Sequence, residues 1–125
     1  MLESRKLNAA DGFEMSRDDN QARTILRLKG HLGLDSSPAL RDQLLGMLQG
    51  QPPKAVFVDL AGLSYIDASG VATLLEALKV ARHRNSTLCL TGLQGRQLHL
   101  FEVTGVLRLF ESDQCRNASS ELKVP

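Results

Sequence analysis

The side chains with the most evident chemistry in this chain lie in one short segment, residues 64–70, with the sequence SYIDASG. Asp67 supplies a carboxylate and Ser69 supplies a hydroxyl where an apolar stretch gives way to a helical pattern. A carboxylate at the start of a helix accepts hydrogen bonds from the free N–H groups of the first turn, and such a helix end also attracts anions. The segment therefore predicts an Asp67 helix cap that can also serve as a contact site, where Gly70 leaves room for a partner to approach.

Catalysis at this turn would use Ser69 as a nucleophile, as in a serine hydrolase. The nucleophile elbow of such enzymes has glycine two residues before and two residues after the serine. Here these two positions hold Asp67 and Val71. The general base would have to be one of the three histidines, and no spacing connects any of them to the serine: His31, His83 and His99. We therefore predict that the chain is not an enzyme and has no catalytic residue.

A phosphate-accepting receiver domain would instead use Asp59, with Asp18 and Asp19 as metal-binding acids. The order is wrong for that fold, because the acidic pair precedes an apolar strand and no lysine closes the last strand near Phe110. Neither of the common nucleotide-binding motifs, G-x-x-x-x-G-K and G-x-G-x-x-G, is present. We expect no cofactor and no metal site.

The turn has to be positioned by a strand before it and a helix after it. Residues 55–60 are almost continuously apolar, which is typical of a central strand covered on both faces. After Asp67, apolar residues recur at helical spacing over about 16 residues, with charged residues on the opposite face. The segment therefore predicts a strand, a tight turn and a long amphipathic helix.

The flanking segments complete an α/β pattern. Strands over residues 12–17 and 22–29 are expected to form a hairpin, and Ser37 and Pro38 are expected to start a helix that ends at Gly50. A buried strand over 87–91, a helix over 94–104, a short edge strand over 106–110 and a helical turn around 117–122 follow. We predict an α/β fold: a mostly parallel, mixed sheet of about five strands, with right-handed crossovers, helices packed on the sheet and an N-terminal hairpin.

The length of 125 residues fits one domain, expected over residues 12–112. A polar tail is expected over 1–11 and a tail or short helix over 113–125. A net charge of +1 and an aromatic content of 4% argue against nucleic-acid binding, and no run approaches the roughly 20 apolar residues that membrane insertion needs. Cys89 and Cys115 have neither C-x-x-C nor metal-site spacing, so we expect free thiols, a reducing compartment and a cytoplasmic location.

The stretch from Leu60 to Leu75, LAGLSYIDASGVATLL, resembles the signature of the STAS domain family, to which bacterial anti-sigma factor antagonists belong. Residues 28–32 resemble the family's L-x-G-x-L after its second strand. A later family stretch, L-F-x-x-x-G-L-x-x-x-F, is matched by Leu98, Phe101, Gly105 and Phe110. The similarity runs from about residue 22 to residue 110, and the Asp-x-Ser-Gly turn is its most specific part.

The resemblance implies a non-enzymatic regulatory module that binds an anti-sigma serine kinase and so frees a sigma factor. In that family, phosphorylation of a hydroxyl at this turn breaks the complex, and a phosphatase restores it. The phosphorylated residue there directly follows the aspartate, a position held here by Ala68. Ser69 is therefore the phosphorylation candidate, unless the switch is absent and binding is constitutive.

The partner-binding turn implied by the resemblance comprises residues 67–70, with Ser64, Tyr65 and Thr73 as further contact candidates. The protein is expected to be a monomer or a weak homodimer. A second class of STAS protein is the accessory subunit of a lipid-transporting ABC system, which binds the system's ATPase, and a stressosome-type scaffold is a third.

Overall fold

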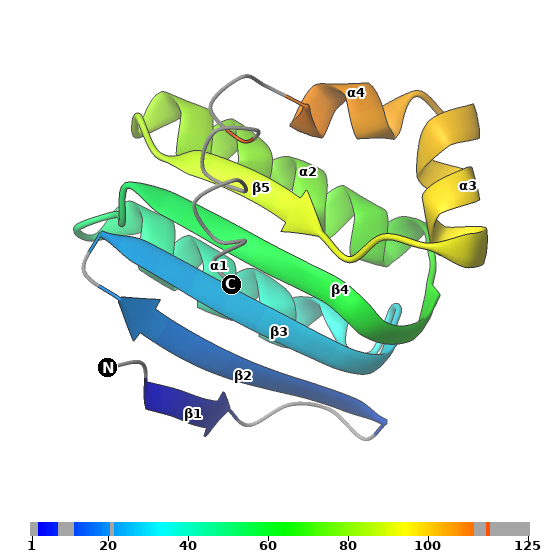
Figure 1. Ribbon diagram of the computed structural model, residues 1–125, viewed down its shortest axis with the longest axis horizontal. Helices are drawn as coiled ribbons and strands as arrows, with labels where there is room; N and C mark the ends of the chain where they lie inside the picture. The colour runs from blue at the N-terminus through cyan, green and yellow to red at the C-terminus, as the bar shows by residue number, and fades with distance from the viewer. Residues whose placement is uncertain (1–2, 8–11, 21, 112–114, 116–125) are drawn as a thin grey trace, which may run out of the picture.

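A five-stranded sheet forms the centre of the protein, and its strands lie side by side in the order in which they occur in the chain (Figure 1). The computed structural model describes residues 3–7, 12–20, 22–111 and 115. The strands are β1 (Glu3–Leu7), β2 (Phe13–Asn20), β3 (Arg23–Leu32), β4 (Ala55–Ile66) and β5 (Thr87–Thr91). The helices are α1 (Ser37–Gln49), α2 (Ala68–His83), α3 (Gly95–Val103) and α4 (Val106–Phe110).

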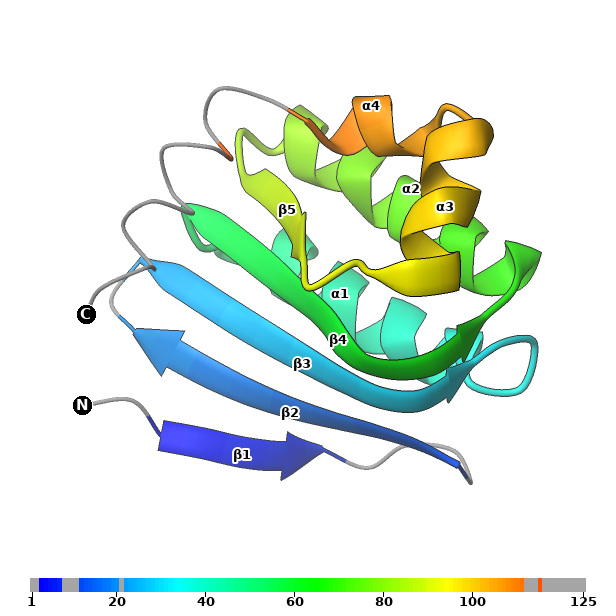
Figure 2. The same ribbon diagram turned by 45° about the vertical axis from the view of Figure 1, so that its right-hand side comes forward.

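The sheet is mixed, as predicted, but it is not mostly parallel, because the N-terminal strands add as many antiparallel pairs as there are parallel ones. The pairs β1–β2 and β2–β3 are antiparallel, whereas β3–β4 and β4–β5 are parallel. Helix α1 connects β3 to β4 and helix α2 connects β4 to β5, and both helices lie on the same face of the sheet (Figures 1 and 2). The α/β class and the N-terminal hairpin are thereby confirmed, with β2 and β3 as the hairpin strands.

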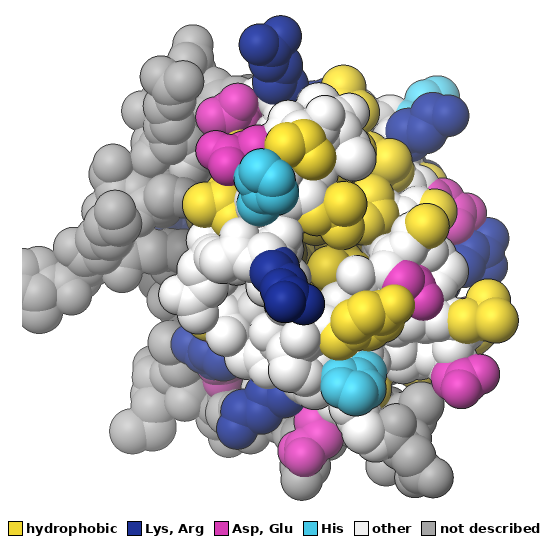
Figure 3. Space-filling model, turned by 90° about the vertical axis from the view of Figure 1, so that its right-hand side faces the viewer, with side chains coloured by type: hydrophobic (Ala, Val, Ile, Leu, Met, Phe, Trp, Pro, Cys, Tyr) yellow, Lys and Arg dark blue, Asp and Glu magenta, His cyan; other side chains and the backbone are white. Residues whose placement is uncertain are grey.

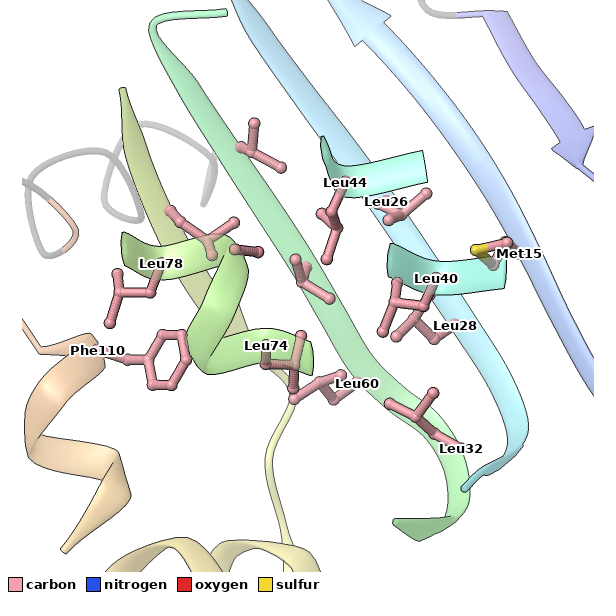
Figure 4. Packing of buried hydrophobic residues seen from close by; sticks show 14 of the residues in the cluster. Met15, Leu26, Leu28, Leu32, Leu40, Leu44, Leu60, Leu74, Leu78 and Phe110 are labelled. Carbon is pink, nitrogen blue, oxygen red and sulfur yellow. The ribbon is translucent and has the colours of Figure 1, made fainter. Parts of the chain in front are cut away.

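The main core lies between this face of the sheet and helices α1 and α2 (Figure 4). Leu40 and Leu44, one helical turn apart on α1, are fully buried, and so is Leu74 of α2. All three belong to the same apolar cluster as the leucines of β3. Burying a leucine side chain contributes about 1.5–3 kcal/mol. The leucine-rich pattern of the sequence therefore accounts for how the two helices are attached to the sheet.

Strand β4 extends past the predicted end at Leu60 and reaches Ile66, and its pairing with β3 contains two irregularities. One lies between Arg27 and Lys29 and one between Gly30 and His31, and each places an extra β4 residue opposite β3. At the first of them, a Cβ on Gly62 would lie 2.8 Å from the Leu28 carbonyl oxygen. The irregular end of β4 leads directly into the turn at Asp67.

The structure differs from the prediction at three places among the described residues. Residues 3–7, expected in a polar tail, form edge strand β1. Residues 106–110, expected as an edge strand, form helix α4, which follows Gly105 in the left-handed conformation at φ 77°. The N-cap of α1 is Ser36, with Ser37 as the first helical residue. The helical turn expected over 117–122 lies outside the described residues.

The two cysteines form a disulfide, so the prediction of free thiols is wrong. Cys89 of β5 and Cys115 are bonded, with their Cα atoms 5.6 Å apart and a sequence separation of 26. That Cα separation is typical of a disulfide, and sequence spacing does not reveal it. The buried position predicted for Cys89 is confirmed, since 1% of its surface is exposed.

Candidate functional site

Asp67 caps helix α2, as the sequence predicts. Its backbone is extended, and its Oδ1 accepts hydrogen bonds from the Ser69 N–H at 2.9 Å and the Gly70 N–H at 3.2 Å. The same oxygen accepts the Ser69 hydroxyl proton at an Oγ–Oδ1 distance of 2.6 Å. One carboxylate oxygen therefore holds three donors, and the side chain of Ser69 is tied to the cap.

The environment of the Asp67 carboxylate lowers its pKa. The largest cause is the hydrogen bond from the Ser69 side chain, followed by the one from the Gly70 backbone, and desolvation opposes them. Hydrogen bonds donated to a carboxylate favour its charged form. The turn therefore presents a negatively charged cap.

The positions of Ala68 and Ser69 differ in a way that matters for phosphorylation. Ala68, which stands at the family's acceptor position, is exposed at the start of α2. Ser69 is half-buried, and its hydroxyl is occupied by Asp67. A kinase acting on Ser69 would have to displace this hydrogen bond.

Asp67 also contacts the loop between β3 and α1. A Cβ on Gly33 would lie 2.9 Å from Asp67 Oδ2, so only glycine fits here without moving the carboxylate. The Asp67 N–H donates to the Leu32 carbonyl at 3.1 Å, and the Leu34 backbone contributes to lowering the Asp67 pKa. The turn and the loop are therefore held together through one residue.

Gly70 has a different role from the one that the sequence suggested. It is buried, and a Cβ there would lie 2.8 Å from Leu32 Cγ and 2.9 Å from Ile66 Cγ1. The glycine thus allows α2 to pack closely on the ends of β3 and β4, instead of opening the turn to a partner.

A shallow hollow of about 290 Å³ lies beside the turn, between the starts of α1 and α2. Leu34 lines the hollow, and 76% of its surface is exposed to solvent. Across the hollow, Arg41 of α1 donates two hydrogen bonds, at 2.8 and 2.9 Å, to Glu76 of α2. The residues that line it are Leu34, Ser37, Pro38, Arg41, Asp42, Ser69, Ala72 and Thr73. Ser69 thus lines a hollow whose other lining residues are both apolar and charged.

Tyr65, which is not among the residues that line the hollow, is half exposed, and its ring is edge-on to that of His31 with the ring centres 5.7 Å apart. Ser64 is exposed and donates its hydroxyl proton to the Gly30 carbonyl. Thr73 differs from these two candidates, because it is 8% exposed and donates to the Ser69 carbonyl within α2. Figure 3 views the protein from the end that carries the turn and shows hydrophobic side chains gathered there among charged ones.

Sequence reasoning missed two residues of this surface, Leu34 and Arg41. A leucine in a loop and an arginine on a helix are ordinary residues, and only the juxtaposition of the β3–α1 loop, α1 and α2 places them beside Ser69. The neighbouring Gly33 and the sequence G-L-D-S-S-P signalled the loop, but nothing in it signalled the exposure of the leucine.

Two acids of the rejected receiver interpretation, Asp18 and Asp59, lie on the sheet face away from α1 and α2, whereas Asp19 lies on the α1 side and pairs with Arg17. Arg27 of β3 forms ion pairs with both Asp18 and Asp59. Within the described ranges, no group of three or more His, Cys, Asp or Glu side chains has an arrangement that could hold a metal ion. A second cavity, of about 640 Å³, lies near the other end of the sheet, between the β2–β3 turn and the end of α1, and includes none of the predicted site residues.

None of the helices in the described part of the chain has both the length and the apolar character needed to cross a membrane. The helix following the candidate turn, α2, is 16 residues long and amphipathic.

Comparison with known proteins finds a family and a set of similar folds. The family model described as "Mlab, STAS domain" matches residues 15–111. The anti-sigma-B factor antagonist of Listeria monocytogenes is 41% identical over 54 residues, which make up 43% of this chain and 47% of the relative. The match therefore spans about half the length of that relative.

Two solved structures share the fold at low sequence identity. An anti-sigma factor antagonist from Mycobacterium paratuberculosis aligns with a TM-score of 0.69 at 17% identity, covering 90% of this chain and 97% of that one. The Bacillus cell fate determinant SpoIIAA in its phosphorylated form aligns with a TM-score of 0.67 at 15% identity, covering 87% and 99%.

Proposed function

This chain belongs to the STAS domain family, and on that premise we propose that it is a regulatory binding module of the anti-sigma factor antagonist type. It binds an anti-sigma serine kinase in the cytoplasm and so frees a sigma factor for transcription. The named relatives support this role. The observation that carries it in this protein is the surface at the start of α2, where an exposed leucine, an ion pair and a capped turn surround a hollow.

The composition of this surface favours protein docking over catalysis. In the free protein, 76% of the surface of Leu34 and 50% of that of Tyr65 are exposed to solvent. Exposed aliphatic and aromatic residues around a polar feature are typical of sites that a protein partner covers. The Ser69 hydroxyl donates to the same Asp67 oxygen that caps α2, which favours a structural and binding use of the turn over nucleophilic catalysis.

Phosphorylation of Ser69 would act as the switch. The hydroxyl that now donates to Asp67 would become an acceptor with a charge of about −1.5 to −2, placed beside a carboxylate of low pKa. The phosphate and the Asp67 carboxylate would repel each other. The carboxylate would then shift from its place against Gly33, and the shape and charge of the hollow beside Ser69 would change. A phosphatase acting on Ser69 would restore the binding form.

Replacing Leu34 by serine tests the docking surface. Leu34→Ser should weaken binding to the cognate anti-sigma kinase at least about tenfold, because an exposed apolar anchor is lost. Isothermal titration calorimetry measures the affinity, and the melting temperature shows that the fold is intact. The matched control is Val103→Ser at the end of α3, a residue 64% exposed and outside the hollow, which should leave affinity unchanged. Equal losses in both variants would contradict the location of the site.

Ser69 is tested by charge and by direct modification. Ser69→Glu should weaken the kinase complex about tenfold or more, whereas Ser69→Ala, which removes the hydroxyl without adding charge, should retain it. Incubation with the kinase and ATP, followed by peptide mass spectrometry, should find one phosphate, on Ser69. Unmodified Ser69 in a complex of undiminished affinity would mean a constitutive antagonist.

The STAS domain match also allows the alternative named above, an accessory subunit that binds the ATPase of a lipid-transporting ABC system. Both functions would use the same turn, so the partner distinguishes them. Titrating the protein in parallel with a purified anti-sigma kinase and with a purified ABC ATPase from its own organism gives the answer. Binding to the ATPase alone would replace the antagonist assignment.

A further inference from the structure

Ser69 and Arg41 line the same hollow from two neighbouring helices, α2 and α1 (Figure 2). Among the described residues that line it, Arg41 is the one cation. On α2, Ser69, Thr73 and Glu76 follow one another at intervals of four and three residues, so they lie along one face of the helix. At about 1.5 Å per residue, Glu76 is about 10 Å further along the helix axis than Ser69. Arg41 is therefore bonded to the far end of a row of side chains that begins at Ser69.

The ion pair that Arg41 forms with Glu76 lies at the surface. The Arg41 Nε and Nη2 groups donate to the two carboxylate oxygens of Glu76 at 2.8 and 2.9 Å. The two side chains are 51% and 41% exposed. The hydrogen bond from Arg41 is the largest cause of the lowered pKa of the Glu76 carboxyl, and desolvation opposes it. Because ion pairs this exposed contribute little to stability, a more highly charged anion in the hollow can take Arg41 from Glu76.

We propose that Arg41 binds the phosphoryl group of phosphorylated Ser69 and leaves Glu76 to do so. This inference rests on the proposed function, which makes Ser69 the acceptor. In the modification, Ser69 Oγ attacks the γ-phosphorus of ATP, the hydroxyl proton passes to a base of the kinase, and ADP leaves. The phosphate then carries a charge of about −1.5 to −2 at pH 7, against −1 for the Glu76 carboxylate. A planar guanidinium binds such a group through two parallel hydrogen bonds.

The groups around Ser69 explain why the phosphate needs Arg41. The start of a helix ordinarily binds phosphate through its N–H groups, but here the Ser69 and Gly70 N–H groups already donate to Asp67. Asp67 Oδ1 also loses the Ser69 hydroxyl proton as a donor once Oγ is phosphorylated. A second carboxylate, Asp42, lines the hollow. The phosphate is thus added among like charges, and Arg41 supplies the opposite charge on this surface.

The exchange would change the docking surface at two points. Glu76 would lose its partner and present an exposed carboxylate on α2. The Arg41 guanidinium would move toward the turn, into the hollow that Leu34 also lines. A partner that fits the unmodified surface would therefore meet a different charge pattern on both sides of the hollow.

The exchange is tested on the full chain with phosphoserine inserted at position 69 during synthesis, so no kinase is needed. The pKa of Glu76 is followed by carbon-13 NMR of its side-chain carboxyl, with serine and with phosphoserine at position 69. In the wild-type background, phosphorylation should raise it toward the usual range of glutamate, because the carboxyl loses Arg41. In Arg41→Gln, the Glu76 pKa should be in that range already, and phosphorylation should change it much less.

The phosphate itself gives the second measurement, a phosphorus-31 NMR titration of the same proteins. The second pKa of the phosphoserine should be higher by about 0.5 or more in Arg41→Gln than in wild type, because the dianion loses its cation. The matched control is Lys79→Gln, which removes one positive charge from an exposed position on α2 outside the hollow and should leave this pKa unchanged.

A Glu76 pKa that phosphorylation leaves unchanged, or a phosphoserine pKa that Arg41→Gln leaves unchanged, would overturn the proposal. These results are separate from the kinase assay. If the kinase leaves Ser69 unmodified while the inserted phosphoserine takes Arg41 from Glu76, the proposed switch fails and the Arg41 site stands. If the kinase modifies Ser69 and Arg41 stays on Glu76, the switch stands and this role of Arg41 fails.

Discussion

At the scale of single residues, Asp67 does two things at once. Its Oδ1 collects the first donors of α2, and its Oδ2 lies against Gly33 of the β3–α1 loop. The loop carries Leu34, the most exposed large apolar residue among those described. Protonation or displacement of this carboxylate would therefore alter both the cap of α2 and the loop that carries Leu34.

The lowered pKa of Asp67 predicts how its contribution depends on pH. Because the carboxyl binds a proton less readily in the folded protein than in the unfolded chain, unfolding takes up a proton at acid pH, and stability falls as pH falls. Wild type should melt above Asp67→Asn at neutral pH, because asparagine keeps the capping oxygen but not the charge, and the difference should shrink below about pH 4. Differential scanning calorimetry from pH 7 to pH 3 measures it, and parallel curves would contradict a stabilising charged cap.

At the scale of elements, the close approach of α2 to the strand ends depends on Gly70. Alanine there would place Cβ within 3.0 Å of atoms of Leu32 and Ile66, so Gly70→Ala should lower the free energy of unfolding by about 1–3 kcal/mol. The control is Gly46→Ala in the interior of α1, where a Cβ meets nothing within 4 Å. That change should raise the free energy of unfolding by about 0.4–1 kcal/mol. Urea denaturation gives both values, and a stabilised Gly70→Ala would show that the strand ends shift easily.

The elements that the sequence predicted well are those with a long pattern. The 16 residues of α2 and its Asp67 cap could be derived from apolar spacing and one capping residue. Residues 106–110 could not, because five residues that are apolar except for Arg108 fit a short strand as well as a helix. Their state is decided by the left-handed Gly105 before them and by Phe110, which packs into the main core.

Strand β1 and the disulfide were unpredictable for a related reason. The sequence ESRKL has no apolar alternation, and its structure comes from pairing with β2. The partner of Cys89 is 26 residues away, at a distance that only the fold determines. At the site, the helix cap could be predicted from Asp67. Leu34 and Arg41 could not be predicted, because only the tertiary fold places them beside Ser69.

At the scale of the whole molecule, the disulfide should change the stability of the protein without changing its fold. Closing a loop of this length is worth about 3 kcal/mol, mainly by restricting the unfolded chain. Dithiothreitol should therefore lower the melting temperature of wild type by about 10 °C and leave Cys115→Ser unchanged. Circular dichroism follows both the temperature and the retained secondary structure. A reductant effect of similar size in Cys115→Ser would point to a cause other than the bond.

The sequential order of the strands also bears on how the chain is made. Because each strand pairs with the one before it, every new strand that leaves the ribosome finds its partner already present. The disulfide is an exception, since Cys89 must wait for residue 115, which takes roughly 1–5 s of further synthesis at about 5–20 residues per second. During that interval the nascent chain presents Cys89 as a thiol, so oxidation marks a chain that has been translated past helix α4.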